Sequence, residues 1–311
     1  MSEYMRLITD IDRVEDGELS LAVATIGFFD GVHCGHRFLI EQVCREAKGR
    51  ELSSMLVTFT EHPRMVMRTG YQPRLLSTFD EKCRLLADTG VDVCVALPFT
   101  RELATLSARD FMQQVLRDRL HVRVLVIGYD HRFGHNRAEG FDDYVRYAKE
   151  LGMEVVRAEA CRLEEMHVSS SAVRTLLEEG KVDVASRCLG YNYSLCGRVA
   201  TGQQIGRTLG FPTANLQVCD GWKLVPADGV YAVRVHVGDH TYKGMLNIGC
   251  RPTIDDDVHR TIEVHLLQFD GDLYGEHLRI EFVRRIRGEQ KFSCREELAR
   301  QLQLDAEIAS E

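Results

Sequence analysis

The sequence predicts an α/β protein of two domains, a parallel-sheet domain followed by a small antiparallel β-barrel domain with a C-terminal helix. Three observations support this fold class. The chain has 311 residues, 44% of them hydrophobic, which is enough for about two cores. From about residue 21 to residue 180, short apolar runs alternate with helical patterns, as in βαβ units. From Tyr193 onward, strands and turns follow one another, which favours a small closed barrel.

The parallel sheet is expected to use the apolar runs at residues 21–26, 54–59, 91–97, 122–127 and 154–158. Helical patterns separate them, at residues 38–48, 80–89, 108–120 and 144–151. Two further helices should end at Gly180 and Gly190, since glycine suits a helix C-cap. Ligands of open α/β sheets bind beyond the carboxyl ends of the strands, so the loops after these runs should carry the functional residues.

The pattern changes near residues 184–190, and we place the domain boundary between residues 1–185 and 186–311. Residues 230–237 and 242–248 should form a hairpin, because apolar and polar residues alternate on both sides of Gly238-Asp239. Residues 261–269 and 277–286 should supply further strands. A closing helix should begin just after Ser293, where residues 293–296 match a capping box. Its main apolar residues are Leu298, Leu302 and Ile308.

Bulk composition argues against several classes of function. The formal charge of −8 has the wrong sign for a protein that binds a nucleic-acid backbone, so we expect no nucleic-acid partner. Residues 1–20 contain no apolar signal segment and no run of 18 apolar residues occurs, which argues against export and membrane spanning. The ten cysteines form no C-x-x-C pair, which favours free thiols and a cytoplasmic location. Nothing in the pattern indicates an oligomeric state.

The most informative stretch is residues 26–36, IGFFDGVHCGH, where an apolar strand ends at glycines and a helix begins. His33 and His36 should lie at or just before the helix N-terminus, where unpaired amides and the helix dipole attract phosphate. Gly31 and Gly35 would let the backbone approach a ligand closely, and the two histidines would act as hydrogen-bond donors to it. Half of a zinc site, or two histidines without such a role, are the alternatives.

Three later loops carry polar groups in comparable positions. His62 follows residues 54–59 and precedes a proline, which fits either ligand contact or a rigid turn. Asp130 follows residues 122–127 between two glycines, which fits a nucleotide pocket or a surface turn. A serine run opens the helix near residue 170, and an arginine lies one turn further on. Helix capping explains one serine, whereas three serines with an arginine suit phosphate binding. These residues are Ser169, Ser170, Ser171 and Arg174.

The C-terminal half contains a second polar cluster, at residues 202–215, GQQIGRTLGFPTAN. Its glycines would let a loop wrap phosphates through backbone amides, although a plain hairpin excursion would also use them. Thr213 and Asn215 offer oxygen atoms suited to a hard cation. Glu263 alternates with the apolar Ile262 and Val264, so it faces away from them. It either faces a pocket or lies on a solvated strand face.

These motifs resemble those of the riboflavin kinase/FAD synthetase branch of the nucleotidyltransferase superfamily. Residues 29–36 resemble its F-D-G-V-H-x-G-H signature, and residues 202–215 resemble its G-x-x-x-G-R-x-L-G-F-P-T-A-N motif. Residues 169–174 resemble its S-S-T/S-x-x-R motif and residues 249–253 its G-x-R-P-T loop. The resemblance extends from Thr25 to about Asp305. The chain departs from the family pattern at Phe28, Glu61 and His131, where Asn, Pro and Phe are common.

The resemblance implies a Rossmann-like nucleotidyltransferase domain followed by a riboflavin kinase barrel. The barrel would phosphorylate riboflavin with ATP to give FMN, and the first domain would transfer AMP from ATP to FMN, giving FAD and pyrophosphate. Both steps would use Mg²⁺. The implied catalytic residues are His33, His36 and Glu263. The implied ATP-binding residues are Gly31, Gly35, Ser169, Ser170, Ser171, Arg174, Gly202, Gly206, Arg207 and Gly210. The implied flavin-binding residues are His62, Asp130 and Arg251, and the implied metal ligands are Thr213 and Asn215.

Two other classes of protein explain less of the chain. Another H-x-G-H enzyme, such as a pantetheine-phosphate adenylyltransferase or a class I aminoacyl-tRNA synthetase, would leave residues 212–215 without a role. The synthetase would also require a basic RNA-binding face. A non-catalytic flavin-binding regulator would need the fold without the catalytic and metal-binding groups. Because both sets of motifs are present, the sequence favours the bifunctional enzyme.

Overall fold

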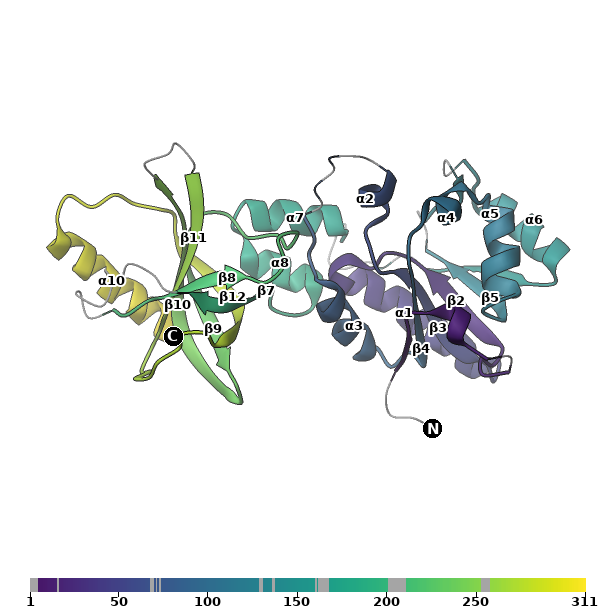
Figure 1. Ribbon diagram of the computed structural model, residues 1–311, viewed down its shortest axis with the longest axis horizontal. Coiled ribbons are helices and arrows are strands. Elements are labelled where there is room, and N and C mark those ends of the chain that lie inside the picture. Colours follow the sequence, from purple (N-terminus) through teal and green to yellow (C-terminus); the bar gives the residue numbers. More distant parts are fainter. Residues whose placement is uncertain are drawn as a thin grey trace. The chain divides into compact units, whose positions relative to one another are not determined.

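The computed structural model describes residues 5–15, 17–67, 70, 72, 74–128, 131–135, 138–159, 161, 168–200, 211–252 and 258–311. The chain divides into two compact units, Met1–Ser169 and Ser170–Glu311 (Figure 1). Within the described residues, no helix has the length and apolar character needed to cross a membrane. No disulfide joins the nine cysteines whose side chains the structure describes.

The first unit contains a six-stranded parallel sheet in the order β1-β4-β3-β2-β5-β6 (Figure 1). After β2 the chain adds β3 and β4 on one side and then returns to add β5 on the other. The crevice beyond the carboxyl ends of β2 and β5 is therefore the topological switch point, where such sheets bind ligands. The strands are β1 (Arg6–Ile8), β2 (Ala22–Ile26), β3 (Ser53–Phe59), β4 (Val93–Leu97), β5 (Val122–Ile127) and β6 (Glu154–Arg157).

Helices cover both faces of this sheet. Successive side chains of each strand point to opposite faces, so apolar strands present two faces that must be buried. Val124 packs in one cluster with Val43 of α1, whereas Leu125 packs in another with Leu116 and Tyr144. The helices of the unit are η1 (Ile11–Arg13), η2 (Asp30–Val32), α1 (Cys34–Gly49), α2 (Pro63–Met67), α3 (Phe79–Ala87), α4 (Arg101–Thr105), α5 (Ala108–Asp110), the π-helical η3 (Phe111–Arg117) and α6 (Phe141–Leu151).

The second unit is a closed antiparallel barrel in the order β10-β11-β8-β7-β12-β9. The predicted fold class is thus confirmed for both halves. The strands are β7 (Ser194–Ala200), β8 (Ala214–Val218), β9 (Gly229–Val237), β10 (His240–Pro252), β11 (Val258–Leu266) and β12 (His277–Arg287). The helices are α7 (Ser170–Glu178), α8 (Val182–Leu189) and α10 (Arg295–Ser310).

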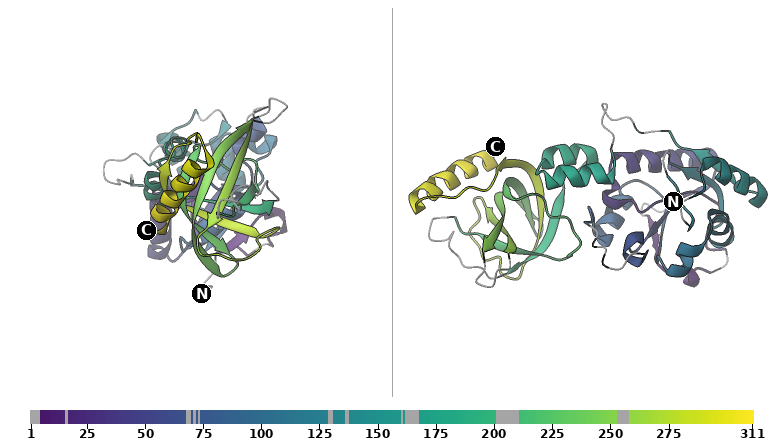
Figure 2. Two further views of the ribbon diagram at one scale, coloured as in Figure 1. Left: turned by 90° about the vertical axis from the view of Figure 1, so that its left-hand side faces the viewer. Right: turned by 90° about the horizontal axis from the view of Figure 1, so that it is seen from above.

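The barrel interior is filled by alternate residues of its strands, including Tyr231, Val264 and Phe282. The outer faces of β9 and β10 are covered as well, because α10 lies along this wall (Figure 2). Ala232 and Met245 on the outer wall pack in one cluster with Ala309 of α10. This packing leaves room for a cavity between the outer wall and the helix.

Two details of the closing helix differ from the prediction. Glu297 takes the capping role expected for Glu296: its Oε2 atom accepts bonds from the Ser293 N–H at 2.9 Å and the Ser293 hydroxyl at 2.8 Å. Ile308 is 36% exposed, whereas Asp305 and Ala309 are buried. Asp305 takes a buried position because its carboxylate pairs with a strand arginine.

Candidate functional sites

The loop between β2 and α1 adopts an unusual backbone conformation. Phe29, Gly31 and Val32 have φ angles of 55°, 75° and 36°. Glycine adopts such angles freely, but a bulky or β-branched residue rarely does. Non-glycine residues with positive φ cost about 1–3 kcal/mol each and concentrate at functional sites. The loop that carries the two histidines is therefore held in a strained shape by the rest of the unit.

A buried carboxylate fastens this loop. The Asp30 side chain accepts backbone N–H bonds from Leu76, at 3.0 and 3.1 Å, and from Ser77, at 3.1 Å. In return, the Gly31 N–H donates to the Ser77 hydroxyl at 3.0 Å. The Gly31 N–H could therefore bind ATP, as predicted, only if its buried hydrogen bond to Ser77 were broken. Its positive φ nevertheless shapes the loop.

The two histidines of the motif lie together, as the sequence predicts. His33 is the N-cap of α1, and its Nδ1 atom accepts the His36 N–H at 3.3 Å. The two rings stack with centroids 3.6 Å apart and planes 18° apart. A Cβ atom at Gly35 would lie 3.2 Å from the His33 ring, so glycine leaves space for the stacked pair. Both imidazoles thus sit at the N-terminus of a 16-residue helix.

His36 is neutral at pH 7. Burial lowers its pKa well below the usual value, and the neighbouring His33, His131 and Lys82 lower the pKa further. Its Nδ1 atom is inaccessible to solvent and has no hydrogen-bond partner in the part of the chain that the structure describes. A buried unpaired polar atom is uncommon in proteins and is explained when a ligand supplies the partner.

His62 and His131 follow the strands on either side of β2. His62 accepts the Arg64 N–H at its Nδ1 atom, at 3.1 Å, which forms a turn at the start of α2. Its ring meets the Phe28 ring edge-on, with centroids 4.7 Å apart. His131 stacks on Phe133, with centroids 6.2 Å apart. The family departures at Phe28 and His131 therefore place aromatic or imidazole rings around the histidine loop.

Other predicted residues of the phosphate and flavin sites have more limited descriptions. Ser169 ends the first unit, and Ser170, Ser171 and Arg174 lie on the first turns of α7. Arg251 lies in β10, but the structure does not describe its side chain. Asp130, Gly202, Gly206, Arg207 and Gly210 lie outside the described residues. Their roles stay predictions.

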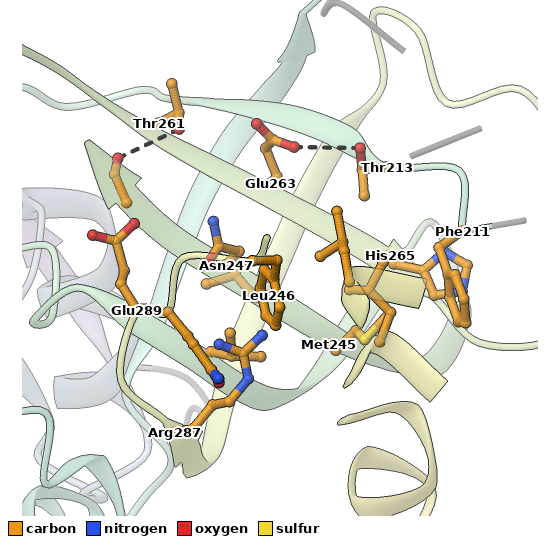
Figure 3. A pocket seen from close by; sticks show the side chains of 16 residues that line it. Phe211, Thr213, Met245, Leu246, Asn247, Thr261, Glu263, His265, Arg287 and Glu289 are labelled. Atoms are coloured by element: carbon orange, nitrogen blue, oxygen red, sulfur yellow. Dashed lines mark hydrogen bonds between the residues drawn. The ribbon is translucent and has the colours of Figure 1, made fainter. Parts of the chain in front are cut away.

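The barrel carries a cavity of about 350 Å³ on its outer wall (Figure 3). Glu263 projects into it from β11, and its Oε2 atom accepts a bond from the Thr213 hydroxyl at 3.4 Å. In register, Glu263 lies opposite Asn215 of β8 and Asn247 of β10. Residues directly opposite in antiparallel strands share a face of the sheet. The structure thus brings the predicted base and the two predicted metal ligands to one patch of the barrel wall.

The lining of this cavity combines apolar contact with a few polar groups, as small-molecule sites do. The apolar lining includes Phe211, Met245, Phe292, Leu298 and Leu302, and the polar lining includes Asn247, Glu263, His265, Arg287 and Glu289. The Nδ1 atom of His265 donates a hydrogen bond to the Pro212 carbonyl oxygen at 2.7 Å, and this bond fixes the segment before Thr213. Gly249 lies against the end of the Glu289 side chain, which would have to shift if position 249 carried a Cβ atom.

A second cavity, of about 440 Å³, lies on the adjoining part of the wall. Asn215 and Arg260 line it, and Thr261 lines both cavities. Glu263 lines the first cavity and its neighbour in register, Asn215, lines the second, so the pair spans the boundary between the two cavities. Such an arrangement suits a reaction between two bound substrates.

The available ligands favour a hard cation over zinc. The Thr213 hydroxyl, the Asn215 amide and the Glu263 carboxylate all present oxygen atoms, which Mg²⁺ prefers. Among the described residues, no group of three or more His, Cys, Asp or Glu side chains could hold a metal ion. The part of the chain that the structure describes therefore offers His33 and His36 no set of further zinc ligands.

Sequence reasoning missed two buried charged groups beside these sites. Lys82 lies beneath the histidine loop, and Asp305 of α10 pairs with Arg287 at the barrel cavity. The sequence signal that could have identified both residues is their spacing from apolar residues of the same helix. Lys82 lies four residues before the buried Leu86, and Asp305 lies four before the buried Ala309. A charged residue on an apolar helix face is a candidate for a buried, paired role.

Comparison with known proteins assigns both halves of the chain. A family model described as FAD synthetase matches residues 16–172, and one described as riboflavin kinase matches residues 189–311. The bifunctional riboflavin kinase/FMN adenylyltransferase of Escherichia coli K12 is 36% identical over 308 residues, covering 99% of this chain and 97% of the relative. That of Pseudomonas fluorescens is 37% identical over 287 residues, covering 92% and 91%. A crystal structure described as a macrolide-efflux protein from Streptococcus pneumoniae has a TM-score of 0.89, is 29% identical and covers 98% of both chains.

Proposed function

The chain belongs to the family of bifunctional riboflavin kinase/FMN adenylyltransferases, and from this we propose that it makes FAD from riboflavin in two ATP-dependent steps. The observation that carries the proposal is that each family segment has its own polar site. The FAD synthetase segment contains the stacked histidine pair at a helix N-terminus. The riboflavin kinase segment contains Glu263 beside Thr213 in a cavity of suitable size.

In the kinase step, the 5′-hydroxyl oxygen of riboflavin attacks the γ-phosphorus of ATP. A new P–O bond forms, and the bond between the β- and γ-phosphates breaks to release ADP. An alkyl alcohol is a weak nucleophile, so a carboxylate must accept or orient its proton. Glu263 is suited to this role, because it faces the cavity and is held by the Thr213 hydroxyl. We assign the flavin to the first cavity and the nucleotide to the adjoining one, on the far side of Asn215.

In the adenylyl-transfer step, a phosphate oxygen of FMN attacks the α-phosphorus of a second ATP, and pyrophosphate leaves. No covalent intermediate with the protein is needed. The reaction needs donors that stabilise charge on the phosphoryl oxygens. His33 and His36 fit this need, because both lie at the N-terminus of α1, whose positive dipole end attracts anions. His36 is neutral and acts as a hydrogen-bonding group rather than as a cation.

We assign the remaining predicted residues to the same steps. Gly31 and Gly35 shape the phosphate loop, and Ser169, Ser170, Ser171 and Arg174 bind phosphate groups of ATP. Gly202, Gly206, Arg207 and Gly210 bind the nucleotide of the kinase step, and His62, Asp130 and Arg251 contact the flavin. The domains that carry the two steps are proposed to be residues 1–185 and 186–311. The enzyme is proposed to act in the cytoplasm, without nucleic acid or membrane as partners.

Magnesium is part of the proposal, with Thr213 and Asn215 as its protein ligands. A divalent cation would neutralise charge on the phosphoryl oxygens of the transferred group. The oxygen donors of these two side chains beside the Glu263 carboxylate support this choice. Chelation of the metal should therefore abolish FMN formation while leaving the fold intact.

The deciding experiment is chromatography after incubation of the full chain with riboflavin, ATP and Mg²⁺. We expect FMN to appear first and FAD to follow, and supplied FMN should give FAD directly. Parallel reactions with a chelator or without ATP should yield neither product. If riboflavin and supplied FMN both remain unchanged with a folded protein, the proposed function is wrong.

A further inference from the structure

A lysine is buried at the carboxyl edge of the parallel sheet. Lys82 of α3 is only 2% exposed. Its Nζ atom donates to the Phe59 carbonyl oxygen at 2.8 Å, the Phe28 carbonyl oxygen at 3.2 Å and the Thr58 hydroxyl at 3.3 Å. An ammonium group has three N–H donors, so these three acceptors satisfy it. All of them are neutral, and no carboxylate among the described residues forms an ion pair with Lys82.

These contacts connect the two strand ends from which the site loops depart. Phe28 lies two residues beyond β2 and begins the histidine loop, whereas Phe59 is the last residue of β3 and precedes the His62 loop. The Thr58 hydroxyl also donates to the Phe28 carbonyl oxygen, at 3.2 Å. Lys82 and Thr58 therefore fix the position of one peptide group immediately before the strained loop.

The lysine also contacts the aromatic ring that precedes this peptide. Its Nζ atom lies 4.1 Å from the centroid of the Phe28 ring, a cation–π contact. The same ring meets His62 edge-on at 4.7 Å. The next residue, Phe29, meets the His36 ring edge-on at 5.2 Å. The ammonium group thus contacts Phe28, whose ring meets His62 and whose chain neighbour Phe29 meets His36.

A charge at this position is costly for stability. Taking an ammonium group out of water is unfavourable, and an apolar side chain of similar volume would avoid that cost. Burial lowers the pKa of Lys82 to about 8, although the nearby Asp30 and the Cys83 and Cys94 thiols raise it. Most Lys82 side chains are still protonated at pH 7. Their charge is one cause of the low pKa of His36.

We propose that Lys82 is a positioning residue for adenylyl transfer, which holds the Phe28 peptide and ring in place and supplies a positive charge at the start of the histidine loop. This inference rests on the proposed function, because the charge is needed only if the histidine loop receives polyphosphate. In a low-dielectric setting, a fixed charge acts on a phosphate chain more strongly than it would in water. The cost of burying Lys82 is then offset when the anion binds.

The test compares Lys82→Met, which keeps the length and removes the charge, with Lys82→Arg, which keeps the charge. Both half-reactions are measured on one preparation of each full-length variant. Misplacing a catalytic group by about 1 Å lowers rates by roughly a hundredfold, so we expect a loss of that order in FAD formation from FMN by Lys82→Met. FMN formation from riboflavin should remain normal, because Glu263 and its cavity lie in the other unit. Lys82→Arg should recover part of the lost rate.

Two further readouts separate positioning from a merely structural role. FAD formation by the wild-type enzyme should decline as pH rises through about 8, where Lys82 loses its proton, and Lys82→Arg should move this decline to higher pH. The His36 imidazole, followed by NMR, should have a higher pKa in Lys82→Met, because one of the charges that lower it is gone.

The outcomes are distinguishable. Wild-type enzyme that makes no FAD would refute the proposed function itself. Wild-type enzyme that makes FAD, with Lys82→Met equally active, would refute the role of Lys82 alone. An equal loss of both half-reactions would also count against it, since that indicates general unfolding. If Lys82→Met does not fold, Lys82→Gln takes its place, and full adenylyl-transfer activity in that folded, uncharged variant would overturn the inference.

Discussion

Arg287 of β12 and Asp305 of α10 form a two-pronged ion pair, with Nε 3.0 Å and Nη2 2.8 Å from the same carboxylate oxygen. The Asp305 side chain has no exposed surface, and Gln301 donates a further bond to it at 2.9 Å. Because Arg287 also lines the barrel cavity, this pair joins the closing helix to the site wall. Removing one partner of a buried pair leaves an uncompensated charge.

Asp305→Ala should therefore lower the free energy of unfolding of the barrel unit by about 3–5 kcal/mol. Urea denaturation followed by tryptophan fluorescence measures this change selectively, because the single tryptophan, Trp222, belongs to the barrel unit. We also expect weaker flavin binding, since Leu298 and Leu302 of α10 line the cavity.

Two variants serve as controls for this prediction. Glu311→Ala removes the partner of Arg284 in an exposed pair and should change stability by less than about 1 kcal/mol. The double variant Arg287→Met/Asp305→Leu replaces the buried pair with apolar groups and should recover most of the stability. A loss for Asp305→Ala no larger than that for Glu311→Ala would contradict the account.

His36→Ala should lower FAD formation from FMN by roughly a hundredfold or more, the usual effect of removing one transition-state donor. FMN formation should continue, because the kinase cavity lies in the other unit. His135→Ala is the matched control, since His135 is an exposed histidine of the same unit. Equal loss of both activities in a folded His36→Ala protein would refute the assignment of His36 to a separate adenylyl-transfer site.

The proposed domain boundary is tested by fragments that begin at Ser170 and at Ser186. We expect both to phosphorylate riboflavin, because the barrel and α10 carry the kinase site. The longer fragment should be more stable. Ser186 lies inside α8, and α7 contributes the Leu177 carbonyl oxygen that accepts the Ala227 N–H at 2.9 Å. A soluble, folded fragment from Ser170 without kinase activity would implicate residues of the first unit in that step.

Regular elements of this protein were predictable where the hydrophobic period was sustained. The apolar run at residues 122–127 matches β5, and the helix expected to end at Gly190 matches α8, because each is apolar on its buried side. β1 has only three residues, of which one is buried, and so short a strand shows no recognisable alternation of apolar and polar residues. β7 ends just before the glycine-rich motif at residues 202–215 and β8 begins inside it, at Ala214, so the motif interrupts the strand pattern.

The candidate sites were predictable only where the groups are close in sequence. His33 and His36 lie within one helical turn, so their proximity followed from the pattern. The contacts of Lys82 with Phe28 and Phe59 depend on how α3 packs against two strand ends, which no local period encodes. The Arg287–Asp305 pair likewise depends on how α10 packs against the closed barrel, which no local period encodes.

Glu263→Gln tests the carboxylate to which the kinase step is assigned. The change keeps the size of the side chain and removes its capacity to accept the proton of the riboflavin hydroxyl. General-base assistance contributes about a hundred- to ten-thousandfold, so FMN formation should fall on that scale. Riboflavin affinity should change little, because the apolar lining of the cavity is unaltered.

The matched control is Glu289→Gln, which neutralises another carboxylate of the same cavity and should retain most of the kinase activity. Adenylylation of added FMN by Glu263→Gln should continue, because His33 and His36 lie in the other unit. Near-normal conversion of riboflavin to FMN by Glu263→Gln would rule out the base role. The bond from Thr213 at 3.4 Å would then only orient a carboxylate that helps to hold the cation, and FMN formation by Glu263→Gln should require more Mg²⁺ than the wild-type enzyme does.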